Sequence, residues 1–198
     1  MIKKLFDVIS SSLLLLILLP VFLGIALCIR WNSPGPIFFR QTRIGQFGKP
    51  FNIFKFRTMY IGSEQFSALT IGNDHRITNV GQFLRRYKLD ELPQLIDVLR
   101  GTMSFVGPRP EVAKYIAYYP ASARTRILSL RPGMTDWASI RMLRENQLLA
   151  TVSDPEGYYI DHILPKKMRY YLHYVAHQTL LGDLKILCVT LYHILSNT

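Results

Sequence analysis

The sequence has little cysteine and little acid. Its 198 residues include two cysteines, Cys28 and Cys188, which lie in apolar surroundings and form no Cys-x-x-Cys pair. This spacing excludes a disulfide framework and a cysteine zinc motif, and it indicates a reducing compartment. Only 13 acidic residues accompany 24 Lys and Arg, so the formal net charge is +11 at pH 7. The charge calls for an anionic partner, either nucleic acid, acidic lipid headgroups or a phosphorylated substrate.

Apolar residues are plentiful. They make up 49% of the chain and aromatic residues 12%, which is enough for a buried core and excludes a disordered basic tail. The length predicts one domain, or one domain with an anchor.

The N-terminal apolar run predicts a membrane segment. As a helix, residues 13–29 cover about 26 Å, just short of a hydrocarbon core of about 30 Å. Pro20 lies inside the run and predicts a bend, because a proline removes a helical hydrogen bond. Cleavage as a signal peptide is disfavoured because Leu27 spoils the small-residue pattern. A straight span is the commoner form, but Lys3, Lys4 and the basic chain after the run favour two cytoplasmic ends, which only a re-entrant helix provides.

Two adjacent carboxylates form the centre of the candidate site. Residues 88–95 predict the first turn of a helix around Asp90 and Glu91, because Pro93 is favourable there and acids suit that end of the helix dipole. Adjacent helical side chains point about 100° apart, so Asp90 and Glu91 can border one cleft in different roles. One could attack or hold a metal while the other moves a proton. Acids in a first turn are also ordinary stabilising residues. The surrounding cations favour a site for phosphate and Mg²⁺; they are Arg76, Arg85, Arg86, Lys88, Arg100 and Arg109.

Residues 37–59 predict a small two-stranded unit, with short aromatic and β-branched runs separated by glycine and proline. In a strand over residues 51–57, Lys55 and Arg57 project from the same face. They are either solvated charges on an edge strand or a clamp for a pyrophosphate. Further along, Arg109 lies between Pro108 and Pro110, and two fixed φ angles predict a rigid turn that orders this arginine.

Several other segments have helical spacing. Residues 80–86 and 89–99 predict helices, the second ending at Gly101, and residues 60–74 predict a loop. Residues 115–130 predict a helix whose tyrosines, Tyr115, Tyr118 and Tyr119, are more typical of a membrane interface than of a nucleobase surface. In residues 180–195, leucines form one apolar stripe that either packs on the core or lies on a membrane.

Five blocks of the sequence, in this order, resemble those of the bacterial sugar transferases, and more narrowly the small monotopic phosphoglycosyl transferases of the PglC type. The blocks are Arg40-Gln41-Thr42-Arg43-Ile44-Gly45, Lys55-Phe56-Arg57-Thr58-Met59, Leu89-Asp90-Glu91-Leu92-Pro93-Gln94-Leu95, Val106-Gly107-Pro108-Arg109-Pro110-Glu111 and Arg131-Pro132-Gly133-Met134-Thr135. The resemblance covers nearly the whole chain.

This resemblance implies an α+β, predominantly helical monotopic membrane protein with a small β-hairpin. Residues 1–32 would form a re-entrant helix that breaks at Pro20, and residues 33–198 a cytoplasmic catalytic domain with interfacial amphipathic helices. The location implied is the cytoplasmic face of the bacterial inner membrane. The partners implied are a UDP-sugar, polyprenol phosphate and membrane lipids rather than nucleic acid, and a homo-oligomer stays open.

The activity implied is transfer of a phospho-sugar from the UDP-sugar to polyprenol phosphate, with Mg²⁺ and release of UMP. By resemblance Asp90 is the nucleophile that forms a covalent intermediate, Glu91 has a proton-transfer or positioning role, and both lie against the metal. The expected substrate-binding residues are Lys55, Arg57, Arg109, Arg85, Arg43, Arg141 and Arg144, with the choice between Arg141 and Arg144 for the nucleotide left open. The chain departs from the family at Leu19, where many members have serine, and at Thr102, where many have aspartate. A non-catalytic basic membrane adaptor and a transferase that moves only the sugar are the alternatives.

Overall fold

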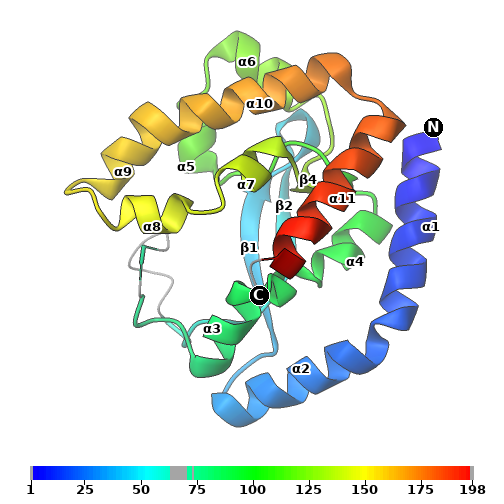
Figure 1. Ribbon diagram of the computed structural model, residues 1–198, viewed down its shortest axis with the longest axis vertical. Coiled ribbons are helices and arrows are strands. Elements are labelled where there is room, and N and C mark those ends of the chain that lie inside the picture. The colour runs from blue at the N-terminus through cyan, green and yellow to red at the C-terminus, as the bar shows by residue number, and fades with distance from the viewer. Residues whose placement is uncertain (1, 63–70, 73, 197–198) are drawn as a thin grey trace.

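The fold is mostly helical and contains two small β-sheets (Figure 1). The computed structural model describes residues 2–62, 71–72 and 74–196. Its elements are α1 Ile2–Ile17, α2 Leu19–Asn32, β1 Phe38–Ile44, η1 Gln46–Gly48, β2 Pro50–Phe56, α3 Asn79–Arg86, η3 Leu89–Glu91, α4 Gln94–Leu99, β3 Ser104–Val106, α5 Ala113–Ile116, α6 Ala121–Ile127, β4 Gly133–Thr135, α7 Trp137–Arg141, α8 Glu145–Leu149, α9 Pro155–Tyr158, η4 Tyr159–Ile163, α10 Leu164–His177 and α11 Leu180–Ser196. The predicted helical majority and small hairpin are confirmed, and most of the predicted loop over residues 60–74 lies outside the described residues.

The two N-terminal helices meet at an angle of 61° (Figure 1). The break falls at Leu18, and Pro20 is the second residue of α2. Because proline has no N–H, the carbonyl four residues earlier loses its helical partner, and the axis bends where the sequence predicts. Within the described residues, no single helix is long and apolar enough to cross a membrane. Helices α1 and α2 reach the necessary length and apolar composition only when they are counted together.

A row of polar side chains attaches α1 to the rest of the fold. Asp7 is buried and accepts hydrogen bonds from the Arg131 guanidinium at 2.8 Å and from the backbone N–H of Phe105 at 3.3 Å. One turn earlier, Lys3 pairs with Asp183 and donates to the carbonyl of Val106 at 3.0 Å. The first turns of α1 are therefore built into the globular fold, although residues 1–32 as a whole were expected to form a membrane helix.

The opposite faces of α1 and α2 expose large apolar side chains. They are Ile2, Leu5, Ile9, Leu13, Leu14, Leu16, Ile17, Leu19, Val21, Leu23, Leu27 and Trp31. The leucine stripe of α11 also faces outward, with Leu184, Leu191 and Leu195 exposed, whereas Asp183 and Ile186 are buried. Leu187 of the same stripe packs against the core, so the stripe is mostly exposed and only in part covered.

Strands β1 and β2 form the antiparallel hairpin, with Arg40 opposite Phe54 and Phe39 opposite Lys55. A second sheet escaped sequence analysis because its strands are three residues long. It pairs β3 with β4 in parallel and brings Gly107 against Gly133 so closely that a Cβ at Gly133 would strike the backbone of Gly107. This close contact between Gly107 and Gly133 fixes the start of the turn that carries Arg109.

Two helix predictions were wrong in their bounds. Residues 115–130 split into α5 and α6, because Pro120 begins a new helix. Tyr115 and Tyr119 are buried in the core, with the Tyr115 ring 4.7 Å from that of Tyr159, so the prediction of a membrane interface was wrong for both. Tyr118 alone of the three is exposed. The predicted helix over residues 89–99 divides into η3 and α4.

Candidate active site

The carboxylate pair lies in a tight turn rather than in the first turn of an α-helix. Lys88 adopts a left-handed conformation with φ +57°, and η3 follows directly. The backbone N–H of Leu92 bonds to the carbonyl of Leu89 at 3.2 Å, and that of Leu95 to Leu92 at 3.0 Å, so the winding is that of a 3₁₀ helix. A non-glycine residue at positive φ costs free energy, and such positions cluster at functional sites.

Glu91 is held by two cations from distant parts of the chain. The Lys55 ammonium on β2 donates to its Oε1 at 2.7 Å. The Arg109 guanidinium donates to both oxygens, reaching Oε2 at 3.2 Å. Burial acts to raise the pKa of Glu91, but Arg109 and Lys55 outweigh it and hold the pKa well below its usual range. Glu91 is therefore ionised and fixed in place.

Asp90 has the opposite surroundings. Its side chain is 7% exposed, and its Oδ1 has no hydrogen-bond partner among the described residues. Burial and the neighbouring Glu91 charge raise the pKa of Asp90, against the opposing effects of Lys55, Lys88 and Arg85. A buried carboxylate oxygen without a donor is costly, and it is free to bond to an incoming group.

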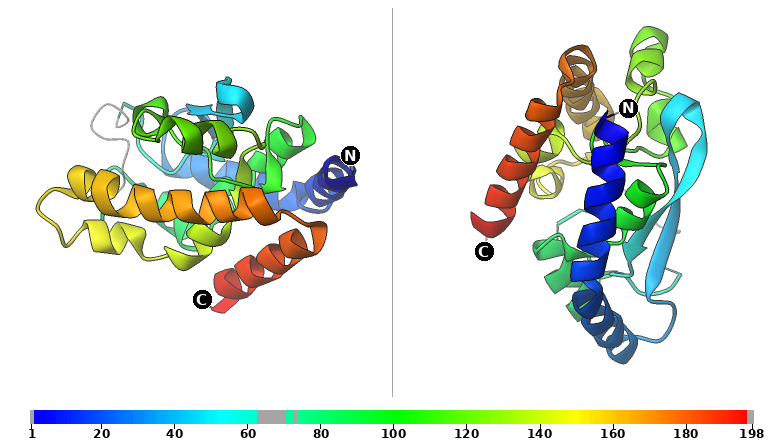
Figure 2. Two further views of the ribbon diagram at one scale, coloured as in Figure 1. Left: turned by 90° about the horizontal axis from the view of Figure 1, so that it is seen from above. Right: turned by 90° about the vertical axis from the view of Figure 1, so that its right-hand side faces the viewer.

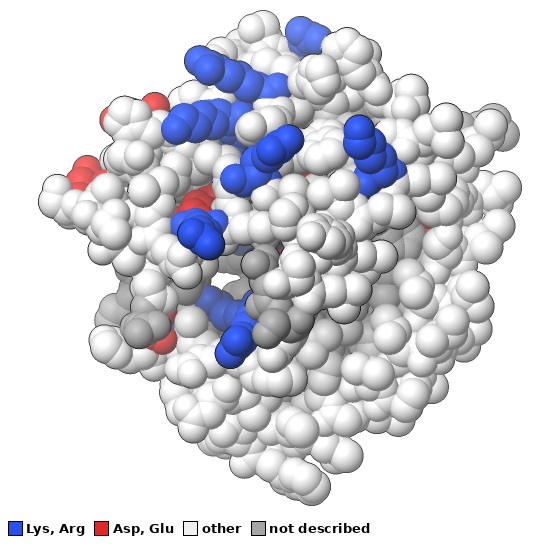
Figure 3. Space-filling view, in the orientation of Figure 1, with Lys and Arg blue, Asp and Glu red and all other residues white. Residues whose placement is uncertain are grey.

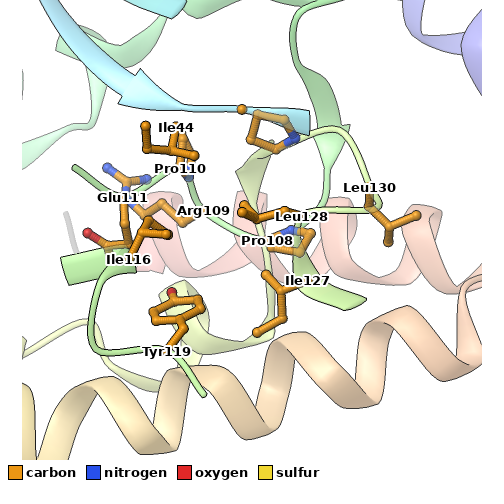
Figure 4. Close-up of a pocket in the computed structure, with 12 residues that line it drawn as sticks. Ile44, Pro108, Arg109, Pro110, Glu111, Ile116, Tyr119, Ile127, Leu128 and Leu130 are labelled. Atoms are coloured by element: carbon orange, nitrogen blue, oxygen red, sulfur yellow. The ribbon is translucent and has the colours of Figure 1, made fainter. Parts of the chain in front are cut away.

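The predicted rigid turn around Arg109 is present. It continues from β3 and is held by the Gly133 N–H, which donates to the carbonyl of Pro108 at 3.0 Å. Figure 4 shows Arg109 and Glu111 beside a cavity of about 10 Å³, about the size of one water. Arg43 donates to the carbonyl of Pro110 at 3.2 Å and lies 3.7 Å from Glu111. Arg43 thus braces the turn from β1.

Lys55 and Arg57 do not project together. Arg57 follows the end of β2, is 4% exposed, and donates to the carbonyls of Ser33, at 2.8 Å, and Pro34. Its guanidinium therefore holds the turn after α2, and the structure does not place it beside Glu91. The expectation of a clamp formed by this pair is corrected, because the chain leaves the strand at Arg57.

The other predicted residues lie at different distances from the pair. Arg85 donates to the Thr58 hydroxyl at 2.8 Å, and its charge acts on Asp90. Arg141 ends α7, and Arg144 precedes α8; both are exposed, and neither side chain makes an ion pair within the described part of the chain. Lys and Arg side chains gather over one face of the molecule, around an opening (Figure 3).

The oxygen ligands near Asp90 are too few for a metal that is bound by protein side chains alone, but they are compatible with Mg²⁺. Across the described residues, no group of three or more His, Cys, Asp and Glu side chains could hold a metal. Mg²⁺ commonly binds through one or two carboxylates, with water and substrate phosphates completing its shell. The unpartnered oxygen of Asp90 meets that requirement, whereas both oxygens of Glu91 are occupied by Arg109 and Lys55.

Sequence reasoning gave no role to Gln94. It is 1% exposed, and its Nε2 has no partner within the described structure. It is the first residue of α4, three positions after Glu91. In the sequence, Gln94 is marked only as a polar residue within the apolar segment Leu92-Pro93-Gln94-Leu95.

Comparisons with known proteins identify the family of the chain. The family model described as bacterial sugar transferase matches residues 1–197. The chain therefore belongs to the bacterial sugar transferase family.

The chain is also similar to individual proteins. It is 37% identical over 196 residues to the UDP-glucose:undecaprenyl-phosphate glucose-1-phosphate transferase of Escherichia coli (strain K12), covering 97% of this chain and 40% of that protein. A protein of the same name from Caulobacter vibrioides is 45% identical over 148 residues, 72% of this chain and 54% of that one. A protein of Bacillus subtilis named uncharacterized sugar transferase EpsL is 33% identical over 193 residues, covering 98% of this chain and 87% of its own. The chain thus spans about two fifths of the length of the Escherichia coli relative.

Proposed function

We propose that the chain is an enzyme that transfers a phospho-sugar from a UDP-sugar to polyprenol phosphate, forming polyprenyl-diphosphate-sugar and UMP, and so initiates the synthesis of a glycoconjugate or polysaccharide. The observation that carries this proposal is the asymmetry of the carboxylate pair. Asp90 has a buried oxygen that no described residue contacts, while Glu91 binds Lys55 and Arg109. Relatives named as sugar-phosphate transferases to undecaprenyl phosphate support it.

In the first step, a carboxylate oxygen of Asp90 attacks the phosphorus that bears the sugar. The bond from that phosphorus to the oxygen bridging the two phosphates breaks, and UMP leaves with that oxygen and the electron pair. The product on the protein is an aspartyl-phosphosugar. Lys55 and Arg109 lessen the repulsion between the anionic carboxylate and the diphosphate.

In the second step, an oxygen of polyprenol phosphate attacks the same phosphorus. The bond to Asp90 breaks, the carboxylate is regenerated, and the sugar phosphate leaves on the lipid. Covalent catalysis lets one nucleophile serve a soluble nucleotide and a membrane lipid in turn.

Glu91 acts in this scheme as a positioning residue. Its low pKa makes it a weak base, and its oxygens are engaged by Lys55 and Arg109. A role in moving a proton, one of the two expected from the sequence, is therefore disfavoured.

Asp90, through the oxygen that no described residue contacts, is the residue best suited to hold Mg²⁺. Glu91, the other expected ligand, has its oxygens bound by Lys55 and Arg109. When bound, Mg²⁺ would neutralise charge on the diphosphate. The remaining neutralisation would come from Lys55 and Arg109, which would also hold the phosphates in place.

We place the protein at the cytoplasmic face of the bacterial inner membrane, with α1 and α2 entering and leaving one leaflet at Pro20. The apolar outer faces of both helices and of α11 support this placement, as does the 61° bend. Lys3 and Lys4 before the helix, with a basic chain after it, favour the same side for both ends.

The test is a panel of UDP-sugars incubated with polyprenol phosphate, Mg²⁺ and the full chain. Release of UMP with formation of a diphosphate-linked lipid is the expected result. The names of the relatives include glucose and N-acetylgalactosamine, so both sugars belong in the panel. Release of UDP would identify a transferase that moves only the sugar, and no release with any sugar would indicate a non-catalytic membrane adaptor.

A further inference from the structure

Two arginines outside the active site share one aromatic ring. The guanidinium carbon of Arg40, on β1, lies 3.7 Å from the centroid of the Phe54 ring, and that of Arg100, at the end of α4, lies 5.0 Å from it. Both arginines are exposed. Phe54 thus gathers two like charges that the sequence separates by 60 residues.

One carboxylate compensates part of the charge of the pair. Asp97 is buried, accepts a hydrogen bond from the Phe54 N–H at 2.8 Å and interacts electrostatically with both Arg40 and Arg100. Within the described residues, neither arginine forms an ion pair, and the side chain of Arg40 makes one hydrogen bond, from its Nη2 to the carbonyl of Asn52 at 3.1 Å. The remaining guanidinium donors are available to an anion.

The pair lies close to the first N-terminal helix. Helix α4 packs against both α1 and the hairpin (Figure 2), and the exposed Lys4 of α1 lies beside Gly101, next to Arg100. Helix α2 is connected to the pair through packed aromatic rings, because Phe38 lies 6.1 Å from Phe54 and 5.5 Å from Phe56, and the buried Phe56 lies 5.3 Å from Phe22 of α2. The arginines are therefore next to the exposed start of α1.

We infer that Arg40 and Arg100, with Lys4 at the edge, form a binding site for the phosphodiester headgroup of an anionic membrane lipid. This inference rests on the membrane placement proposed above. Beside Lys4 the outer face of α1 exposes Leu5 and Ile9, which is where acyl chains would lie under a headgroup bound by the arginines.

The chemistry of the site fits that ligand. A phosphodiester carries one negative charge and two free oxygens, which two guanidinium groups can bind through charge-assisted hydrogen bonds. The anion also relieves the repulsion between Arg40 and Arg100. An aromatic face beneath the guanidiniums orders them before binding, so less side-chain entropy is lost. The cationic site lies next to exposed apolar side chains of α1. A lipid can contact both, whereas free phosphate can contact only the cations.

The experiment titrates short-chain phosphatidylglycerol into the full chain in neutral detergent and measures Kd by calorimetry. Short-chain phosphatidylcholine, glycerol phosphate and inorganic phosphate are the comparison ligands. The native protein should bind phosphatidylglycerol saturably and the other three at least tenfold more weakly. The double variant Arg40→Gln/Arg100→Gln should weaken this binding about 30-fold, while Arg40→Lys/Arg100→Lys should keep most of it.

The matched control is Lys166→Gln/Arg169→Gln, which removes the same charge from two exposed cations of α10. Figure 2 shows α10 apart from the hairpin, so the control removes charge from a different part of the surface. This control should bind phosphatidylglycerol within twofold of the native protein. Equal losses in both double variants, equal binding of inorganic phosphate, or no saturable binding to the native protein would each overturn the inference. UMP release, measured on the same preparations, reports separately on the proposed activity.

Discussion

Arg109 holds Glu91 through both carboxylate oxygens, whereas the Oδ1 of the adjacent Asp90 is contacted by no donor from the described residues. Two neighbouring acids thus have pKa values displaced in opposite directions. Such a division indicates two roles, one residue that reacts and one that fixes its surroundings.

Replacing Asp90 with asparagine should abolish turnover and stabilise the fold. The raised pKa of Asp90 means that its ionised form costs stability in the folded state. That cost is absent below the pKa of an unfolded aspartate, about 3.9, and grows as the pH rises through the folded value. Asp90→Asn should therefore raise Tm in detergent near pH 7, and the gain should vanish near pH 4. A lower Tm at pH 7 would contradict the account of Asp90.

Replacing Glu91 with glutamine should have the opposite effect on stability. The pKa of Glu91 is lowered by Arg109 and Lys55, so its ionised form contributes stability above the unfolded value of about 4.3, which is lost as the pH falls through the folded pKa. Glu91→Gln should lower Tm at pH 7 and lose that effect in acid. A double-mutant cycle with Arg109→Gln should show coupling of about 1–3 kcal/mol; additive losses would indicate that the two side chains do not interact.

Removing the charge of Asp7 should loosen α1 from the fold. Asp7 is buried against Arg131 and the Phe105 N–H, and breaking one partner of such a pair costs about 3 kcal/mol. Asp7→Asn should therefore lower the free energy of unfolding by about that amount, measured by thermal unfolding in detergent. The control Asp161→Asn changes an exposed residue and should shift it by less than about 0.5 kcal/mol. Similar small shifts in both would refute the role of Asp7.

A methyl group at Gly133 should displace the turn that carries Arg109. A Cβ there would collide with the backbone of Gly107, whereas one at Gly24 meets nothing. Gly133→Ala should lower both Tm and kcat for UMP release, and Gly24→Ala should preserve both. Unchanged kcat in Gly133→Ala would show that the close contact between Gly107 and Gly133 does not position Arg109.

The sequence predicted features that depend on neighbouring residues. The bend at Pro20, the hairpin and the rigid turn around Arg109 each follow from local stereochemistry. The pairing of Asp7 with Arg131 joins residues 124 positions apart, which no local pattern reveals. Arg57 donates to the carbonyls of Ser33 and Pro34 because β2 ends one residue earlier, and a strand end is set by tertiary packing. Tyr115 and Tyr119 are buried for the same reason, since α10 and η4 cover positions that look amphipathic in the sequence.

The most direct test of the central claim is the intact mass of the chain after incubation with a UDP-sugar and Mg²⁺ in the absence of polyprenol phosphate. The account predicts one phospho-sugar per chain on the peptide that contains Asp90, with one UMP released, and no adduct in Asp90→Asn. Adding polyprenol phosphate should discharge the adduct. An adduct on another residue, or UMP formed only when the lipid is present and without any adduct, would contradict Asp90 as the nucleophile.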